Sequence, residues 1–274
     1  MTRCEFGGPM PVTSIDALPT ETNLSERQSG ILEIVQGRGF ATIEQLSAVF
    51  SVSAQTIRRE VIRLDAAGLL QRFHGGAGIP EDSVRLGYRH KQEAAVGSKG
   101  RIGRVVAGLV PDGASIYLDV GTTVEAVAAA LVGRPLGIVC TNSMSAAAIL
   151  GHSREAEIHV TGGIVRGTDG SLVGNAATKA LAPIAVDFAI IGCSGFAPDG
   201  SPTDFDPQKV AIKQAAIDNA LTAIIVADST KFDRIAVMQI APLSSFDVLV
   251  CDREPHEALG RQLRATGIEV RIAA

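Results

Sequence analysis

Several loops in the C-terminal two thirds of the chain combine glycine, hydroxyl and charged residues in a way that could bind an anion. The first follows a short apolar run that ends at Leu118 and precedes a stretch with a helical pattern, so its backbone N–H groups and the helix N-terminus favour negative charge. Gly121 allows close approach to the backbone, and Thr122 and Thr123 add hydroxyl donors. Further loops follow apolar runs at residues 141–143, 162–163, 194–195 and 228–231.

These loops predict one shared binding rim, because ligands of open α/β sheets bind beyond the carboxyl ends of the strands. A phosphorylated small molecule suits such a rim, with backbone amides on the phosphate and Asp119, Asn142 or Lys231 on its hydroxyls. Each loop alone is more simply an ordinary strand–helix turn, and only the set favours a site. The first loop is neither a Walker A loop nor a full dinucleotide fingerprint, since no Gly-Lys-Thr follows and only Gly121 occupies the turn.

The elements that position these loops are helices and strands in alternation. We expect helices at residues 101–110, 123–132, 143–150, 175–181, 207–221 and 254–265. We expect strands at residues 115–119, 136–140, 157–161, 188–192, 223–227 and 247–251. Because the strands are apolar on both faces and alternate with helices, they predict an α/β domain with a mostly parallel sheet covered on both sides.

Residues 24–78 predict a different, mainly helical unit. Capping boxes begin at Ser25 and Thr42, and a third helix begins near Ser53 and stops at Gly68. Residues 69–74 then predict a short strand before a glycine turn. Two short helices joined by a tight turn and followed by a strand are typical of a winged helix-turn-helix.

The third helix of this unit separates apolar from basic residues. Ile57, Val61 and Leu64 recur at helical spacing and would pack inward. The outward-facing residues of this helix, together with Arg72 and His74 of the predicted strand (the wing), could contact DNA phosphates and guanine edges. These residues are Ser53, Gln55, Thr56, Arg58, Arg59, Arg63, Arg72 and His74. A solvated amphipathic helix would also expose arginines, and it is the strand and turn after Gly68 that favour DNA.

Charge along the chain is distributed unevenly. The net charge of −4 alone argues against a nucleic-acid partner, but residues 51–78 carry Arg58, Arg59, Arg63 and Arg72 against two acidic residues, Glu60 and Asp65. The positive charge is therefore local, as a groove-binding element requires.

Two segments resemble the winged helix-turn-helix of DeoR-family transcriptional regulators: residues 50–59 (FSVSAQTIRR) and 68–77 (GLLQRFHGGA). Glu60 stands where that family often has Asp. Residues 119–128, 187–195, 199–206 and 228–232 are similar to the family's sensor domain, whose fold is related to ribose-5-phosphate isomerase and the CoA-transferase group.

The resemblance implies effector contacts within the second domain. The pattern of polar loops adds Gly163 to these contacts. Lys209 stands where the family usually has an acidic residue, so its positive charge at the rim would alter which phosphate ester binds. The expected effector-binding residues are Asp119, Gly121, Thr122, Thr123, Asn142, Gly163, Asp204, Asp206, Lys213 and Lys231.

The resemblance implies a DNA-binding repressor of glycerol 3-phosphate or sugar catabolic genes, relieved by a phosphorylated metabolite, with glycerol 3-phosphate favoured. Its partners would be a double-stranded DNA operator and a second copy, in a homo-oligomer (dimer or tetramer), because palindromic operators need two recognition helices. One alternative is a sugar-phosphate isomerase-like enzyme fused to the helical module, with Asp119, Asp204, Asp206, Lys213 and Lys231 in proton transfer. Another is a nucleoid-type DNA binder without an effector.

Length and composition agree with two domains. The chain has 274 residues, 46% of them apolar and 4% aromatic, so its cores must consist of Ala, Val, Ile and Leu. No apolar run reaches the roughly 18 residues of a membrane span, no signal peptide begins the chain, and the four cysteines are widely spaced, so we expect a cytoplasmic protein with no metal, cofactor or catalytic site. Met10 is a second possible start. The expected divisions are a disordered tail (1–23), the winged helix-turn-helix (24–78), a linker (79–98) and the phosphosugar-sensing domain (99–274).

Overall fold

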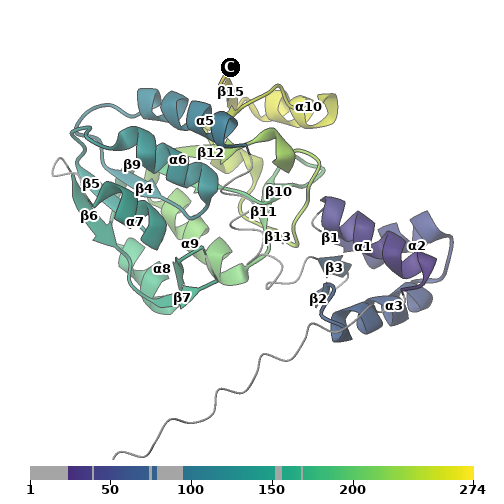
Figure 1. The fold of residues 1–274 in the computed structure, drawn as a ribbon. Helices are drawn as coiled ribbons and strands as arrows, with labels where there is room; N and C mark the ends of the chain where they lie inside the picture. Colours follow the sequence, from purple (N-terminus) through teal and green to yellow (C-terminus); the bar gives the residue numbers. More distant parts are fainter. Residues whose placement is uncertain (1–23, 39, 74–75, 79–94, 152–155, 168) are drawn as a thin grey trace, which may run out of the picture.

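The computed structural model describes residues 24–38, 40–73, 76–78, 95–151, 156–167 and 169–274 (Figure 1). The predicted tail, residues 79–94 of the predicted linker and His74 lie outside the described residues. None of the described helices is both long and apolar enough to cross a membrane.

The N-terminal unit contains α1 (Glu26–Arg38), α2 (Ile43–Phe50) and α3 (Ala54–Ala66). Both predicted capping boxes are confirmed: the Gln28 N–H donates to Ser25 Oγ at 3.2 Å, and the Thr42 N–H donates to Gln45 Oε1 at 2.9 Å. A buried cluster that includes Ile31 joins the three helices. The helical part of the prediction is therefore confirmed.

A small antiparallel sheet completes this unit, in the order β1-β3-β2. It consists of β1 (Phe40–Thr42), β2 (Gln71–Phe73) and β3 (Gly76–Gly78). The sequence predicted β2 but not β1 or β3, because Phe-Ala-Thr and Gly-Ala-Gly show no strand pattern and form strands only by pairing with each other and with β2. Gly76 is required here, since a Cβ would lie 2.3 Å from the Phe40 ring.

The C-terminal domain is built on a seven-stranded sheet in the order β15-β14-β12-β9-β4-β5-β6, and every neighbouring pair is parallel. The predicted parallel sheet is confirmed. Its strands are β4 (Ile116–Leu118), β5 (Ile138–Thr141), β6 (Glu157–Val160), β9 (Val186–Gly192), β12 (Ala220–Ala227), β14 (Val248–Cys251) and β15 (Glu269–Ile272).

Adjacent residues of the central strands supply two cores, one on each face of the sheet. Ile190 and Ile224 pack with α5 (Val96–Leu109), α6 (Thr122–Leu131) and α7 (Met144–Leu150). Ile191 and Ile225 pack with α8 (Asn175–Leu181), α9 (Pro207–Asp218) and α10 (Glu257–Thr266). Figure 1 shows α5 and α6 on one side of the sheet and α9 on the other.

Several boundaries differ from the predictions. The helix expected over residues 101–110 begins at Val96, inside the stretch predicted as linker, and the helix expected over 207–221 ends at Asp218 because Ala220 pairs with Val186 in the sheet. The sequence also did not predict β15 and the short strands outside the main sheet. These strands are the ribbon β7 (Ile164–Arg166) and β8 (Ser171–Val173), and the sheet β10 (Gly195–Phe196), β11 (Pro202–Asp204) and β13 (Met238–Gln239).

Candidate functional site

The outward face of α3 carries the basic side chains expected at a DNA interface. Ile57, Val61 and Leu64 are buried, and the Ser53 Oγ caps the helix by accepting from the Thr56 N–H at 3.2 Å. Thr56 is half-buried, and the other predicted contacts from this helix are exposed: Ser53, Gln55, Arg58, Arg59 and Arg63.

Glu60 is a buried acid on the inward face of α3. Its carboxylate accepts hydrogen bonds from Gln28 Nε2 at 2.7 Å and an Arg27 guanidinium nitrogen at 3.2 Å, so it attaches α1 to α3. Arg63 lies 3.8 Å from the same carboxylate, which orients its exposed side chain. In the wing, the N–H of exposed Arg72 donates to Asp65 Oδ1 at 3.0 Å and fixes β2 against the end of α3.

The loop after β4 forms the N-terminus of α6. Gly121 has φ +121°, a conformation that side chains rarely permit, so glycine is needed at this turn. Because Gly121 is the N-cap residue and has no side chain, no side chain caps α6. The amides of its first turn are therefore oriented for an anion beside half-buried Thr122 and buried Thr123.

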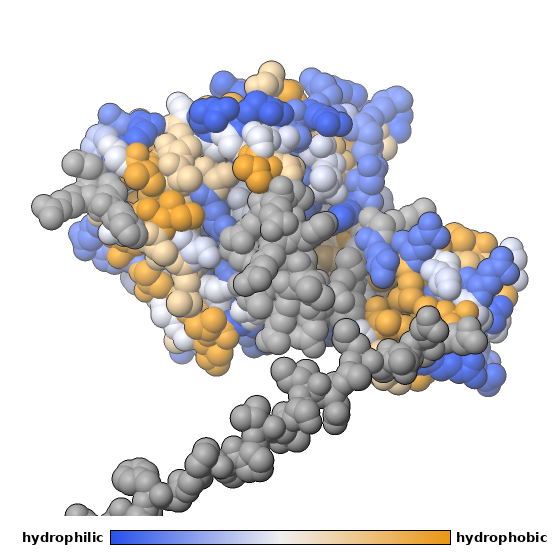
Figure 2. Space-filling model, in the orientation of Figure 1, coloured by the Kyte–Doolittle hydropathy of each residue, from blue (hydrophilic) through white to orange (hydrophobic). Residues whose placement is uncertain are grey.

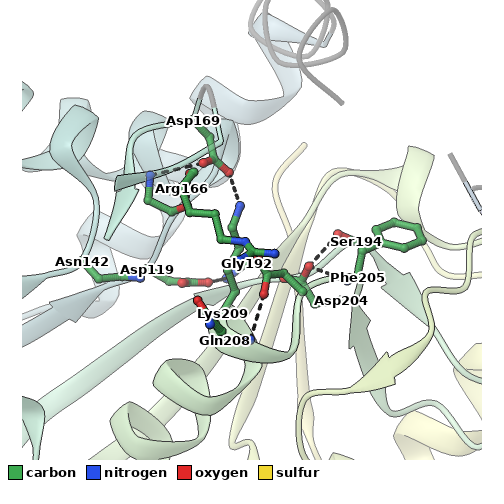
Figure 3. Close-up of polar contacts among 12 residues, drawn as sticks. Asp119, Asn142, Arg166, Asp169, Gly192, Ser194, Asp204, Phe205, Gln208 and Lys209 are labelled. Atoms are coloured by element: carbon green, nitrogen blue, oxygen red, sulfur yellow. Dashed lines mark hydrogen bonds and ion pairs between the residues drawn. The ribbon is translucent and has the colours of Figure 1, made fainter. Parts of the chain in front are cut away.

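A buried lysine joins two carboxylates next to this loop. The Lys213 ammonium contacts Asp119 Oδ2, lies 3.2 Å from Asp204 Oδ2 and donates to the Gly192 carbonyl at 2.8 Å. The Gly192 N–H donates to Asp119 Oδ2 at 3.0 Å (Figure 3). Asp119 Oδ1 is buried and has no hydrogen-bond partner among the described residues. An acceptor in this condition suits a ligand hydroxyl.

The carboxylates of this cluster keep the Lys213 side chain charged. Burial favours the neutral lysine, but Asp119 and Asp204 outweigh burial and raise the pKa of Lys213. Burial also acts to raise the pKa of Asp204, yet Lys213 and Lys209 hold it below its ordinary value. Burial raises the pKa of Asp119 despite its lysine partner.

A second cationic cluster surrounds the 3₁₀ turn at Ser229–Lys231. Burial lowers the pKa of Lys231, and Asp228 opposes that shift. Lys99, buried in α5, also has its pKa lowered by burial and interacts with Asp228 and Lys231. Burial raises the pKa of the Cys193 thiol to about 12, and this thiol is influenced by both Lys231 and Lys213, so the two clusters adjoin.

Lys99 was missed by the sequence analysis, although a signal was present. Lys99, Ile102 and Val106 recur at helical spacing on the buried face of α5, and Lys99 interrupts that apolar stripe. A lysine within a buried apolar stripe is stable only where charged or polar groups lie next to it.

Two ion pairs lie at the outer side of the Lys213 cluster. Arg166 Nε in β7 lies 2.7 Å from Asp206 Oδ2, and Asp206 also caps α9 by accepting from the Gln208 N–H at 2.8 Å. Lys209 Nζ lies 2.5 Å from Asp169 Oδ2 in the β7–β8 turn. Figure 3 shows Lys209 directed toward Asp169, with Arg166 next to this pair. The positive charge of Lys209, whose effect at the rim was considered above, is compensated by Asp169.

The polar loops follow strands that are neighbours in the sheet, so they meet at one edge as predicted. Two of the predicted effector residues are already engaged by the fold. Asn142 is fully buried, accepts from the Tyr117 hydroxyl at 2.8 Å and donates to the Leu172 carbonyl at 3.3 Å. Gly163 has φ +111°, and a Cβ would lie 2.6 Å from the Val173 carbonyl, so its glycine serves a close approach to β8.

The fold and these sites define a helix-turn-helix DNA-binding unit joined to an α/β sensor domain. Residues 27–83 match the DeoR-like helix-turn-helix domain, and residues 94–253 match the DeoR C-terminal sensor domain. The chain belongs to the DeoR family. It is a transcriptional regulator and not the isomerase-like enzyme considered above.

Named relatives include repressors of this family. The glycerol-3-phosphate regulon repressor of Escherichia coli K12 is 36% identical over 231 residues, which are 84% of this chain and 92% of the relative. The HTH-type transcriptional repressor CsqR of the same organism is 31% identical over 251 residues, 92% of this chain and 96% of the relative. A ribose 5-phosphate isomerase A structure from Neisseria gonorrhoeae aligns with a TM-score of 0.35 and 13% identity, covering 50% of this chain and 53% of that one.

Proposed function

We propose that the chain is a repressor whose affinity for a DNA operator falls when a phosphorylated polyol or sugar binds the α/β domain. Glycerol 3-phosphate is the favoured effector, because the relative at 36% identity is named for the glycerol-3-phosphate regulon. The observation that carries the proposal is the N-terminus of α6, which has no side-chain cap. It lies beside two lysine clusters and a buried oxygen of Asp119 that has no hydrogen-bond partner among the described residues.

The site residues have distinct roles in this proposal. The phosphate lies on the amides of the first turn of α6, with the hydroxyls of Thr122 and Thr123 and the charges of Lys231 and Lys99. A hydroxyl of the effector donates to Asp119 Oδ1, which Lys213 holds in place through the other oxygen. A simple phosphate lacks that hydroxyl and binds more weakly.

On the DNA side, the N-terminal half of α3 enters the major groove, with Gln55, Arg58 and Arg59 toward the bases and phosphates. The repressor acts as a homo-oligomer, because a palindromic site requires two such helices about one helical turn apart. The effector must then change operator affinity by a coupling free energy of about 1–3 kcal/mol.

The test combines a thermal-shift panel with DNA release from an operator fragment selected from a random library. The panel contains glycerol 3-phosphate, ribose 5-phosphate, inorganic phosphate and glycerol. We expect a large shift with one phosphate ester and a small one with inorganic phosphate. The phosphate ester that gives the large thermal shift should also release the DNA.

Thr122→Val keeps the side-chain shape and removes the hydroxyl. We expect this variant to bind the operator normally and to lose both the shift and the release. Thr266→Val is the control, since Thr266 is an exposed residue at the end of α10. No shift with any ester, together with DNA binding that shows no sequence preference, would favour the nucleoid-type protein instead.

A further inference from the structure

One strand of the α/β domain is exposed on both of its faces. Among the described strands, β7 pairs with β8 alone. Neighbouring residues of a strand point to opposite faces, yet Ile164 is 71% exposed and Val165 is 56% exposed. Two β-branched apolar side chains on both faces of an outer strand are unusual for a surface that meets only water.

No described strand pairs with the outer edge of β7. Val165 is opposite Leu172 in the antiparallel ribbon, and the Leu172 N–H donates to the Asn142 carbonyl at 2.8 Å, away from β7. The pair is therefore of the antiparallel type that exchanges no hydrogen bonds. By the same alternation, the N–H and C=O of Val165 are directed away from β8, toward the edge.

Two more apolar side chains extend this surface. Met144 is 49% exposed at the start of α7, and its N–H bonds to the Gly170 carbonyl in the β7–β8 turn at 3.1 Å. Val160, 47% exposed, ends the outer strand β6. Figure 2 shows apolar residues at the surface over α7 and at β7, on the left of the domain.

The size of the surface fits a dimer interface. At these exposures the four side chains present roughly 400 Å² of apolar area, comparable to the largest apolar patch of a typical monomer, and such patches often bind a partner. A standard interface buries about 800 Å² per partner, of which about 56–58% is non-polar. Pairing of β7 with a second β7 would place partner side chains beside Ile164 on one face and beside Val165 on the other, so both faces contribute apolar area to such an interface.

We propose that this surface pairs two copies of the chain, with β7 antiparallel to β7 of the second copy about a two-fold axis at Val165. The outward N–H and C=O of Val165 then exchange hydrogen bonds with those of the partner's Val165, and the two ribbons form a sheet in the order β8-β7-β7-β8. Such an interface is isologous, because each copy contributes the same residues. This inference rests on the proposed function only in that a repressor of a palindromic site must be a dimer. The surface that forms the dimer is inferred from β7 itself.

This position of the interface connects it to the effector site. Arg166, in the strand that pairs, holds Asp206 at the start of α9, and Asp169 in the adjoining turn holds Lys209. An effector that moves the start of α9 thereby acts on the strand at the two-fold axis.

Sedimentation equilibrium on the full chain tests the surface. Val165→Lys places two like charges at the axis, and we expect the dimer dissociation constant to rise at least 100-fold. Leu221→Lys is the matched control: Leu221 is 81% exposed and is the second residue of β12, an interior strand of the seven-stranded sheet. We expect it to remain dimeric. A Val165→Lys protein that stays dimeric, or a wild type that is monomeric throughout, overturns the proposal.

A second variant measures the register directly. Hydrogen-bonded antiparallel partners have Cα atoms about 5.5 Å apart, within the range that a disulfide spans. We expect mild oxidation to cross-link Val165→Cys into dimers and to leave Leu221→Cys and the wild type uncross-linked. Absence of that cross-link overturns the two-fold at Val165. The thermal-shift panel on the wild type is a separate readout: absence of an ester response there would count against the proposed function and not against this surface.

Discussion

Lys213 is the residue on which the interior of the sensor domain most depends. It is almost completely buried and faces Asp119 and Asp204, so its removal would leave two carboxylates in the interior without a counter-charge. Breaking a buried ion pair in this way is far more costly than losing a surface pair.

We predict that Lys213→Met destabilises the protein by about 3–5 kcal/mol at pH 7.5. Because Lys213 lowers the pKa of Asp204, that stabilisation is present above the ordinary carboxyl value of 3.8 and is lost as the pH falls through the lowered pKa. Without Lys213, burial raises both carboxyl pKa values, so the variant takes up protons in mild acid and its deficit shrinks at pH 5.

Urea unfolding at the two pH values measures this difference. Lys179→Met, at an exposed lysine in the last turn of α8, is the control and should change stability little. A deficit that is equal for Lys179→Met and Lys213→Met would show that the buried lysine contributes nothing special.

Effector affinity should depend on pH through Lys231. Burial lowers the pKa of Lys231 below 10.5, whereas a bound phosphate favours the charged form and raises it again. The affinity for glycerol 3-phosphate therefore falls as the pH rises through the lowered pKa. Lys231→Arg stays charged and should flatten that decline, leaving the part due to Lys99. Calorimetric titrations between pH 7.5 and 9.5 measure this decline in affinity for both proteins. Identical pH profiles for the wild type and Lys231→Arg would show that Lys231 does not contact the phosphate.

The sequence predicted these site residues unequally. Loop residues such as Thr122 were identified by local pattern, because a strand, a glycine and a helix start are contiguous in the chain. Lys213 was implied only by family resemblance, since its partners Asp119 and Asp204 are distant in sequence. Lys99 was missed because the helix was expected to begin at residue 101, which left Lys99 outside the apolar stripe that it interrupts.

At the scale of elements, hydrophobic pattern predicted those strands that bury both faces. β9 and β12 are long and apolar, so they could be identified without their neighbours. β7, β10 and β13 have two or three residues and exist through long-range pairing, which no local pattern encodes.

The contact between α5 and α6 is the element-scale feature that joins the effector loop to the start of the domain. A Cβ on Gly103 would lie 2.4 Å from the Ala126 carbonyl oxygen, so the two backbones touch. We predict that Gly103→Ala forces the helices apart, destabilises the protein by about 1–3 kcal/mol and weakens effector-driven DNA release.

The control lies in the same helix. A Cβ on Gly108 of α5 would meet nothing within 4 Å, so Gly108→Ala should stabilise the helix by about 0.5–1 kcal/mol. Thermal unfolding and operator release with both variants separate the close contact from the general effect of alanine. Equal behaviour of the two variants would contradict a special role for Gly103.

At the scale of the whole molecule, net charge and DNA binding are compatible because charge is segregated. The chain carries −4 overall, while the exposed face of α3 carries arginines. We predict that Arg58→Ala and Arg59→Ala each weaken operator binding. For a phosphate contact, each should also reduce the slope of log affinity against log salt by about one. Arg253→Ala, at an exposed arginine of the α/β domain, should change neither quantity. An unchanged slope in Arg58→Ala would place that side chain away from the phosphates.

The absence of a side-chain cap on α6 has a consequence for motion. A helix without a side-chain cap frays more readily at that end, and its first amide protons exchange quickly with solvent. A bound phosphate would act as the missing cap, so effector binding and completion of the helix become one event. Amide exchange at Thr122 and Thr123 should therefore slow when the effector binds. This exchange rate would show whether the sensor domain holds its effector, even when no DNA is present.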